Sequence, residues 1–138
     1  YGIAQPELIG GLKKVKDSYN VDAIAITAAT AAIKDQDYFK ENIEKIKADR
    51  QALTEQLRAL RDPATREPKF DVPTSHANFV LAKSNNCKAS EIYDKLVQRN
   101  IYVRFFDLPG VDDKLRITVG TKQQNESLIS ALKQILSE

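Results

Sequence analysis

The sequence is poor in the residues that build disulfides and metal centres. Of its 138 residues, only Cys87 is a cysteine and only His76 is a histidine. A single cysteine cannot form a disulfide within the chain, and one cysteine with one histidine cannot complete a zinc site of His and Cys ligands. Asp112 and Asp113 are predicted to form a turn and not a metal site, because two adjacent carboxylates face one ion poorly. The sequence therefore excludes a disulfide framework and a His/Cys zinc centre.

A strong excess of charge and long apolar runs are also missing. The net charge is +2 with a pI near 8.6, and no basic cluster runs along the chain, which argues against a nucleic-acid partner. No apolar run approaches the ~20 residues of a membrane-spanning helix. The hydrophobic content of 42% is typical of a globular protein with a core. Because there is no methionine and no secretory signal pattern, we expect a piece of a longer protein.

The first half of the sequence predicts three helices. Pro6 opens one that runs to about Lys16, and Asn20 is the expected N-cap of an alanine-rich, packed helix over 21–33. A long helix follows over 35–62, ended by Asp62-Pro63. Its apolar stripe fits either a coiled coil or an amphipathic helix across a domain, with Arg50 at the edge of the stripe. The stripe consists of Phe39, Ile43, Ile46, Leu53, Leu57 and Leu60.

The second half predicts an alternation of short strands and helices. Asn100 is suited to the left-handed position that ends a helix, and Thr121 with Gln124 has the spacing of a capping box. The fold class is therefore α+β: a small open mixed sheet with helices packed on one face, preceded by helices. The predicted elements are an edge strand near 70–72, a strand over 77–82, a helix over 89–99, a strand over 101–105, a hairpin to a strand over 115–119, and a last helix from 121.

The strand over 115–119 carries the candidate functional group. Leu115, Ile117 and Val119 alternate with Arg116 and Thr118, so one face of the strand is apolar and the other polar. A guanidinium on a rigid strand can bind a carboxylate or phosphate through two hydrogen bonds. The alternative is an ordinary surface arginine.

Several segments resemble histidinol-phosphate aminotransferases. The motif Leu-Arg-Ile-Thr-Val-Gly-Thr at 115–121 is the most specific of them. The resemblance covers the whole chain in order, and the chain is similar to the C-terminal part of that family. It implies the tail of a large cofactor domain over 1–34, a long linking helix over 35–62, and a small C-terminal domain over 63–138. The other similar segments are 1–9, 14–21, 75–81 and 100–104.

The resemblance implies a cytoplasmic, homodimeric, fold-type I enzyme that uses pyridoxal 5'-phosphate. Such an enzyme moves an amino group from glutamate to imidazole acetol phosphate in histidine biosynthesis. Arg116 would bind the glutamate carboxylate and then the substrate phosphate, Arg104 would lie near the phosphate, and Tyr19 and Asn20 would lie on a loop close to the site. The family's Schiff-base lysine precedes the segment matching Tyr1, so we expect no catalytic, cofactor-binding or metal-binding residue here and no transamination by this chain alone.

Other interpretations stay open at this point. Related enzymes of the same fold type act on aromatic amino acids or decarboxylate a phosphorylated amino acid, although a pair of arginines favours a phosphorylated substrate. A non-catalytic amino-acid-binding or dimerisation module is a further alternative. Arg104 can also pair with Asp107 or Glu91, and His76 lacks an orienting partner for a role as a base.

Overall fold

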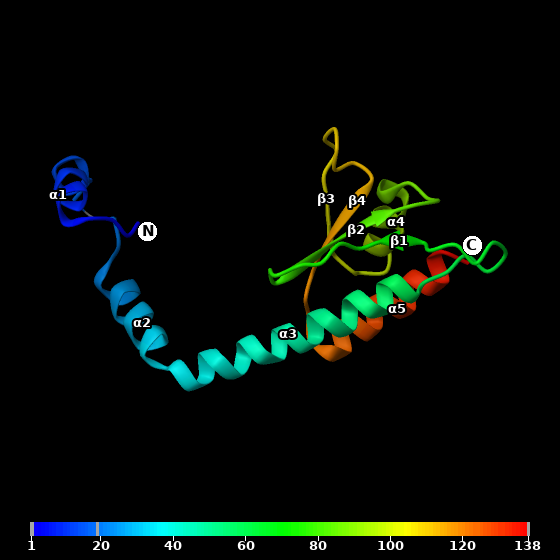
Figure 1. The fold of residues 1–138 in the computed structure, drawn as a ribbon, viewed down its shortest axis with the longest axis horizontal. Coiled ribbons are helices and arrows are strands. Elements are labelled where there is room, and N and C mark those ends of the chain that lie inside the picture. Colours follow the sequence, from blue (N-terminus) through cyan, green and yellow to red (C-terminus); the bar gives the residue numbers. More distant parts are fainter. Residues whose placement is uncertain (1, 19, 138) are drawn as a thin grey trace. The chain divides into compact units, whose positions relative to one another are not determined.

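The computed structural model describes residues 2–18 and 20–137, which fold as two units, Tyr1–Lys40 and Glu41–Glu138 (Figure 1). The division falls within the first turns of the long helix. The three parts predicted from the sequence, 1–34, 35–62 and 63–138, stay a prediction. The elements are α1 (Pro6–Val15), α2 (Ala23–Lys34), α3 (Gln36–Ala59), β1 (Phe70–Asp71), β2 (Phe79–Ser84), α4 (Ala89–Val97), β3 (Arg104–Phe105), β4 (Lys114–Thr118) and α5 (Lys122–Ile135).

The first unit consists of the predicted early helices, with one correction at a helix start. Asp22, and not Asn20, caps α2: its Oδ1 accepts a hydrogen bond of 2.8 Å from the backbone N–H of Ala25. Asp22 stands directly before the first helical residue, whereas Asn20 lies two residues too early to reach the free N–H groups. Every residue of α2 is exposed, so the prediction of a packed helix is wrong for this chain. Ile24 and Ile33 are 82% and 71% exposed.

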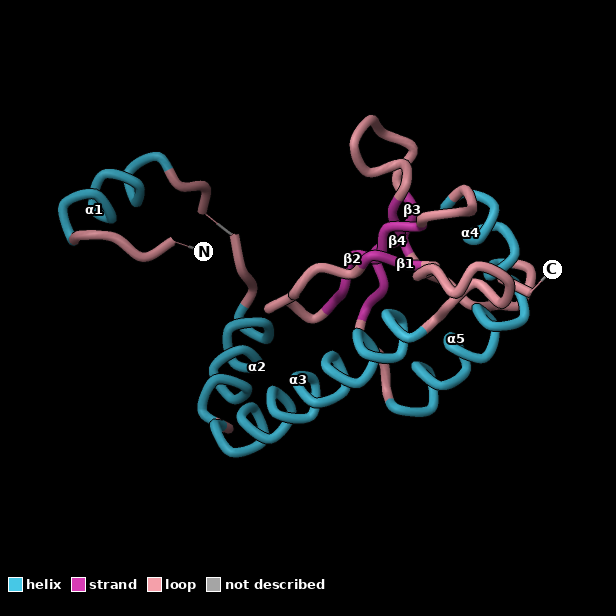
Figure 2. Tube along the Cα trace, turned by 45° about the vertical axis from the view of Figure 1, so that its right-hand side comes forward, coloured by secondary structure: helices cyan, strands magenta, loops and turns pink. Residues whose placement is uncertain are grey.

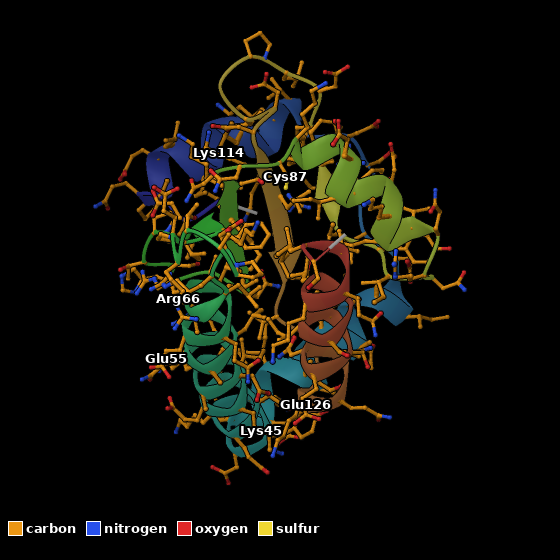
Figure 3. All side chains as sticks on the ribbon, turned by 90° about the vertical axis from the view of Figure 1, so that its right-hand side faces the viewer. Lys45, Glu55, Arg66, Cys87, Lys114 and Glu126 are labelled. Carbon is orange, nitrogen blue, oxygen red and sulfur yellow. The ribbon has the colours of Figure 1, made fainter. Side chains whose placement is uncertain are left out.

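The second unit uses α3 as an amphipathic helix along its core. Leu53 and Leu57 are buried in the same hydrophobic cluster as the sheet, which favours this interpretation over a coiled coil. Arg50 Nη1 donates a hydrogen bond of 2.8 Å to the carbonyl of Ala77, and Arg58 donates to the carbonyl of Val72. The segment before β2 is therefore fastened to α3. The later part of α3 runs beside α5, as Figures 1 and 3 show for the helices that carry the labelled Glu55 and Glu126.

The sheet has the strand order β1-β2-β4-β3, and its three pairings are all antiparallel (Figure 2). The α+β class with helices on one face is confirmed, but the described sheet is antiparallel where the sequence predicted a mixed one. Both β2 and β3 run antiparallel to β4, so they share a direction. The connection through α4 would make them a parallel pair, but β4 turns back by a hairpin and fills the place between them.

One face of the sheet is covered and the other is open. Val80, Ala82, Leu115 and Ile117 are at most 1% exposed and join one core with α3, α4 and α5. The alternate residues of β2 and β4 are half-buried or exposed. The predicted capping box at the start of α5 is confirmed, as is the left-handed Asn100, with φ of 58°. Across residues 2–18 and 20–137, we find no helix with the length and apolar character to cross a bilayer.

Candidate anion-binding site

The sheet register brings the two predicted arginines together. Arg104 of β3 and Arg116 of β4 are directly opposed across the hairpin. Opposed residues of antiparallel strands project to the same face, and here it is the open one, because the neighbouring pair of Phe105 and Leu115 turns toward the core. Leu81 of β2 stands opposite Arg116 on its other side. Residues 12 positions apart in the sequence thus present two guanidiniums from one rigid surface.

Aromatic rings lie against both guanidiniums. The Cζ of Arg104 is 5.1 Å from the centroid of the Phe106 ring, and the Cζ of Arg116 is 5.5 Å from the same centroid. Arg116 also lies 5.4 Å from the ring centroid of Phe79. The negative face of an aromatic ring attracts a cation at these separations. Among the described residues neither arginine has a carboxylate partner, so Arg104 does not form the ion pair with Asp107 or Glu91 left open above.

A second like-charge pair, which also includes a residue of β4, shows what is unusual about the arginines. Lys83 and Lys114 are opposed across β2 and β4, and Asp113 pairs with both: its Oδ2 lies 3.6 Å from the Lys83 Nζ, and its Oδ1 accepts a short hydrogen bond from Lys114. The hydrogen bond from Lys114 is the main reason that the pKa of Asp113 is lowered. Opposed like charges destabilise a strand pair unless something compensates them. Among the described residues, Arg104 and Arg116 lack such a carboxylate.

Two further residues were predicted for the site, Tyr19 and Asn20. Tyr19 lies outside the described residues. Asn20 belongs to the first unit, where its Oδ1 accepts a hydrogen bond of 2.8 Å from Lys16 Nζ. The roles of Tyr19 and Asn20 stay predictions. His76 is exposed, Cys87 is a half-buried free thiol, and the described side chains contain no cluster of three His, Cys, Asp or Glu suited to a metal ion.

The two phenylalanines are not among the site residues predicted from the sequence. Phe106 follows Arg104 by two residues, the spacing at which side chains of an extended chain share a face, and this signal is present in the sequence. Phe79 stands opposite Thr118, two residues from Arg116 on its strand. Only the register between distant strands brings that ring to the arginine, so the contact of Phe79 with Arg116 can be recognised only in the structure.

Comparison with known proteins identifies the family. The model of the family described as aminotransferase class I and II matches residues 1–132. The chain belongs to this aminotransferase family. Its sequence is 46% identical over 136 residues to histidinol-phosphate aminotransferase 1 of Trichormus variabilis, which covers 99% of this chain and 37% of that protein. The chain thus spans a little over a third of the length of such relatives.

Solved structures of aminotransferases share the fold. The crystal structure of the histidinol-phosphate aminotransferase from Clostridium acetobutylicum superposes with a TM-score of 0.81 at 26% identity, over 95% of this chain and 38% of that one. That from Sinorhizobium meliloti, in complex with pyridoxal-5'-phosphate, has a TM-score of 0.79 at 24% identity, over 96% of this chain and 35% of that one. Class I and II aminotransferases depend on this cofactor.

Three lysines in or beside the sheet do not suit a cofactor anchor. A Schiff base requires a lysine whose amine is free to react. On the open face, Lys83 and Lys114 are paired with Asp113, and the buried Lys69 is paired with Asp62 at 2.6 Å. These three lysines therefore do not fit the anchor of such a cofactor.

Proposed function

We propose that the full-length protein is a histidinol-phosphate aminotransferase, and that this chain supplies the arginines that bind its anionic substrates. The proposed reaction moves an amino group from glutamate to imidazole acetol phosphate, giving 2-oxoglutarate and histidinol phosphate. The observation that carries the proposal is the opposed pair of Arg104 and Arg116, which lacks a carboxylate partner among the described residues. The names of the similar proteins support the choice of substrate.

The geometry suits both substrates of the proposed reaction. Bound pyridoxal phosphate supplies the electron sink of the chemistry, while the residues of this chain bind and orient. Arg116 is half-buried, and its planar guanidinium can give two parallel hydrogen bonds to the carboxylate of glutamate. In the second half-reaction the same guanidinium binds the phosphate of the keto substrate, and the exposed Arg104 adds a second positive charge.

Further parts of the proposal rest on the resemblance. The full-length enzyme would be a cytoplasmic homodimer, and its Schiff-base lysine would come from a segment that does not match this chain. The 138-residue chain by itself is then expected to bind anions without transaminating. Exposed apolar side chains of α1 and α2, such as Leu12 and Ile24, are consistent with a larger assembly that covers them.

The test is amino transfer by the full-length protein with each class of amino acceptor. We expect turnover with imidazole acetol phosphate and glutamate, and a much lower kcat/KM with aromatic keto acids. Preference for the aromatic acids would contradict the substrate assignment. Release of carbon dioxide from a phosphorylated amino acid would indicate the decarboxylase alternative. Amino-acid binding by the 138-residue chain as a stable, symmetric assembly, with no reaction by the full-length protein, would favour the non-catalytic module.

A further inference from the structure

Phe106 lies against both arginines of the candidate site. Its ring centroid is 5.1 Å from the Cζ of Arg104 and 5.5 Å from that of Arg116, whereas Phe79 contacts Arg116 only. Phe106 directly follows β3 and is half-buried. The preceding Phe105 packs with the core, where its ring centroid lies 5.9 Å from that of Tyr93. Phe105 therefore fixes the chain at the point from which Phe106 projects.

The choice of a ring has a chemical consequence for the guanidiniums. The carboxylate of Asp113 steadies the neighbouring lysine pair, but it also accepts a hydrogen bond from Lys114 and offsets the charge of Lys83. A ring attracts a guanidinium through its face and accepts none of the five N–H groups in a conventional hydrogen bond. Phe106 can thus hold two mutually repelling cations at a fixed orientation while their donors remain available. A carboxylate in the same place would compete with an anionic substrate.

We infer that Phe106 is a positioning residue that orients Arg104 and Arg116 toward one phosphate-bearing substrate. This inference rests on the proposed function, since it names how that site is organised before the substrate arrives. A phosphate presents several oxygens and close to two negative charges, so it gains more from two prearranged guanidiniums than a single carboxylate does. Loss of the ring should weaken binding of phosphate-bearing substrates more than binding of glutamate.

The experiment compares Phe106→Leu with Phe106→Tyr in the full-length holoenzyme. Leucine keeps the apolar bulk but removes the aromatic face, and tyrosine keeps that face. Two contacts of the usual cation–π strength predict that Phe106→Leu raises KM for the phosphorylated keto substrate about five- to tenfold, with kcat within about twofold. Phe106→Tyr should stay within about twofold of the parent enzyme. Leu108→Ala, at an exposed position of the same hairpin, is the matched control and should change neither constant.

A second readout separates this inference from the proposed function. Inorganic phosphate is titrated into each holoenzyme by calorimetry, which needs no turnover. If the protein does not transaminate but Phe106→Leu still weakens phosphate binding several-fold and Phe106→Tyr does not, the proposed function fails and the role of Phe106 stands. The inference would be overturned if Phe106→Leu and the parent enzyme had the same KM for the phosphorylated keto substrate and the same dissociation constant for phosphate. Equal losses in Phe106→Leu and Phe106→Tyr, or no phosphate binding by the parent enzyme, would also overturn it.

Discussion

The side chain of Asn125 closes a pair of hydrogen bonds on the backbone of Gly120. The N–H of Gly120 donates to Oδ1 of Asn125, Nδ2 of Asn125 donates to the carbonyl of Gly120, and both distances are 3.1 Å. Asn125 is only 8% exposed, although it is polar. Its amide therefore holds the turn that joins the arginine-bearing β4 to α5, and it satisfies two backbone groups that the turn would otherwise leave without partners.

We expect Asn125→Ala to destabilise the chain by about 1–3 kcal/mol, because it leaves the N–H and carbonyl of Gly120 without partners. The measurement is urea unfolding followed by circular dichroism. Gln123→Ala, an exposed position on the same helix, is the control and should change the free energy of unfolding by less than about 0.5 kcal/mol. Equal unfolding midpoints for Asn125→Ala and the parent chain would contradict the role given to this amide.

A side chain at position 120 is predicted to disrupt the capping box of α5. A Cβ there would come within 2.8 Å of Oε1 and 3.0 Å of Cβ of Gln124. That Oε1 accepts the N–H of Thr121 in the capping box, so Gly120→Ala should break the box and cost about 1 kcal/mol. Gly11→Ala is the control: it lies in α1 with nothing within 4 Å of an added Cβ, and its urea midpoint should not fall. An unchanged urea midpoint for Gly120→Ala would show that the turn can accommodate the added Cβ without breaking the capping box.

The ion pair of Asp62 and Lys69 predicts a dependence of stability on pH. The ammonium of Lys69, which is 6% exposed, and the backbone N–H groups of Thr65 and Ala64 hold the pKa of Asp62 well below its ordinary value of 3.8. A carboxyl with a lowered pKa in the folded state stabilises it above the unfolded pKa and loses this effect as the pH falls through the folded pKa. Asp62→Asn should therefore lower the urea midpoint at pH 7.

The difference in urea midpoint between the parent chain and Asp62→Asn should stay constant from pH 7 to about 5 and shrink below about pH 4. Glu41→Gln serves as the control, because it removes the exposed pair of Glu41 with Lys45, and surface pairs of this kind contribute little. A difference that does not change on acidification would show that the carboxylate charge of Asp62 is not what stabilises the fold.

The two arginines are expected to differ in substrate dependence in the full-length enzyme. Arg116→Ala should raise KM for glutamate and for the phosphorylated keto substrate by about ten- to a hundredfold, the effect of losing hydrogen bonds to a charged group. Arg104→Ala should affect mainly the phosphorylated substrate. Steady-state kinetics with each substrate varied in turn provides the measurement, and Arg61→Lys, at an exposed position, is the control. Unchanged saturation by glutamate in Arg116→Ala would argue against carboxylate binding there.

Features governed by local chemistry were predictable from the sequence. The Thr121 capping box, the left-handed Asn100 and the alternation around Arg116 depend on neighbouring residues, and the structure has all three. The N-cap of α2 was assigned to Asn20 and not to Asp22, because both residue types cap helices and the alanine-rich segment does not mark where the helix begins.

Features that depend on distant segments were not predictable in the same way. The sequence shows β2, α4 and β3 in order, but not that β4 occupies the place between the two strands. The pairing of Arg104 with Arg116 and the contact of Phe79 with Arg116 follow from that register. Pairing between strands is decided by which faces are buried together, and this information is shared among residues far apart in the chain.

The position of β4 also sets the order in which this sheet can be completed during synthesis. β4 joins β2 to β3, and it is the last of the four strands to leave the ribosome. Phe79 pairs with Thr118, 39 positions later, so β2 keeps one unpaired edge until β4 has emerged. An exposed strand edge is a template for wrong pairing. Nascent chains that stall before β4 should therefore depend on chaperones more than chains that stall after it.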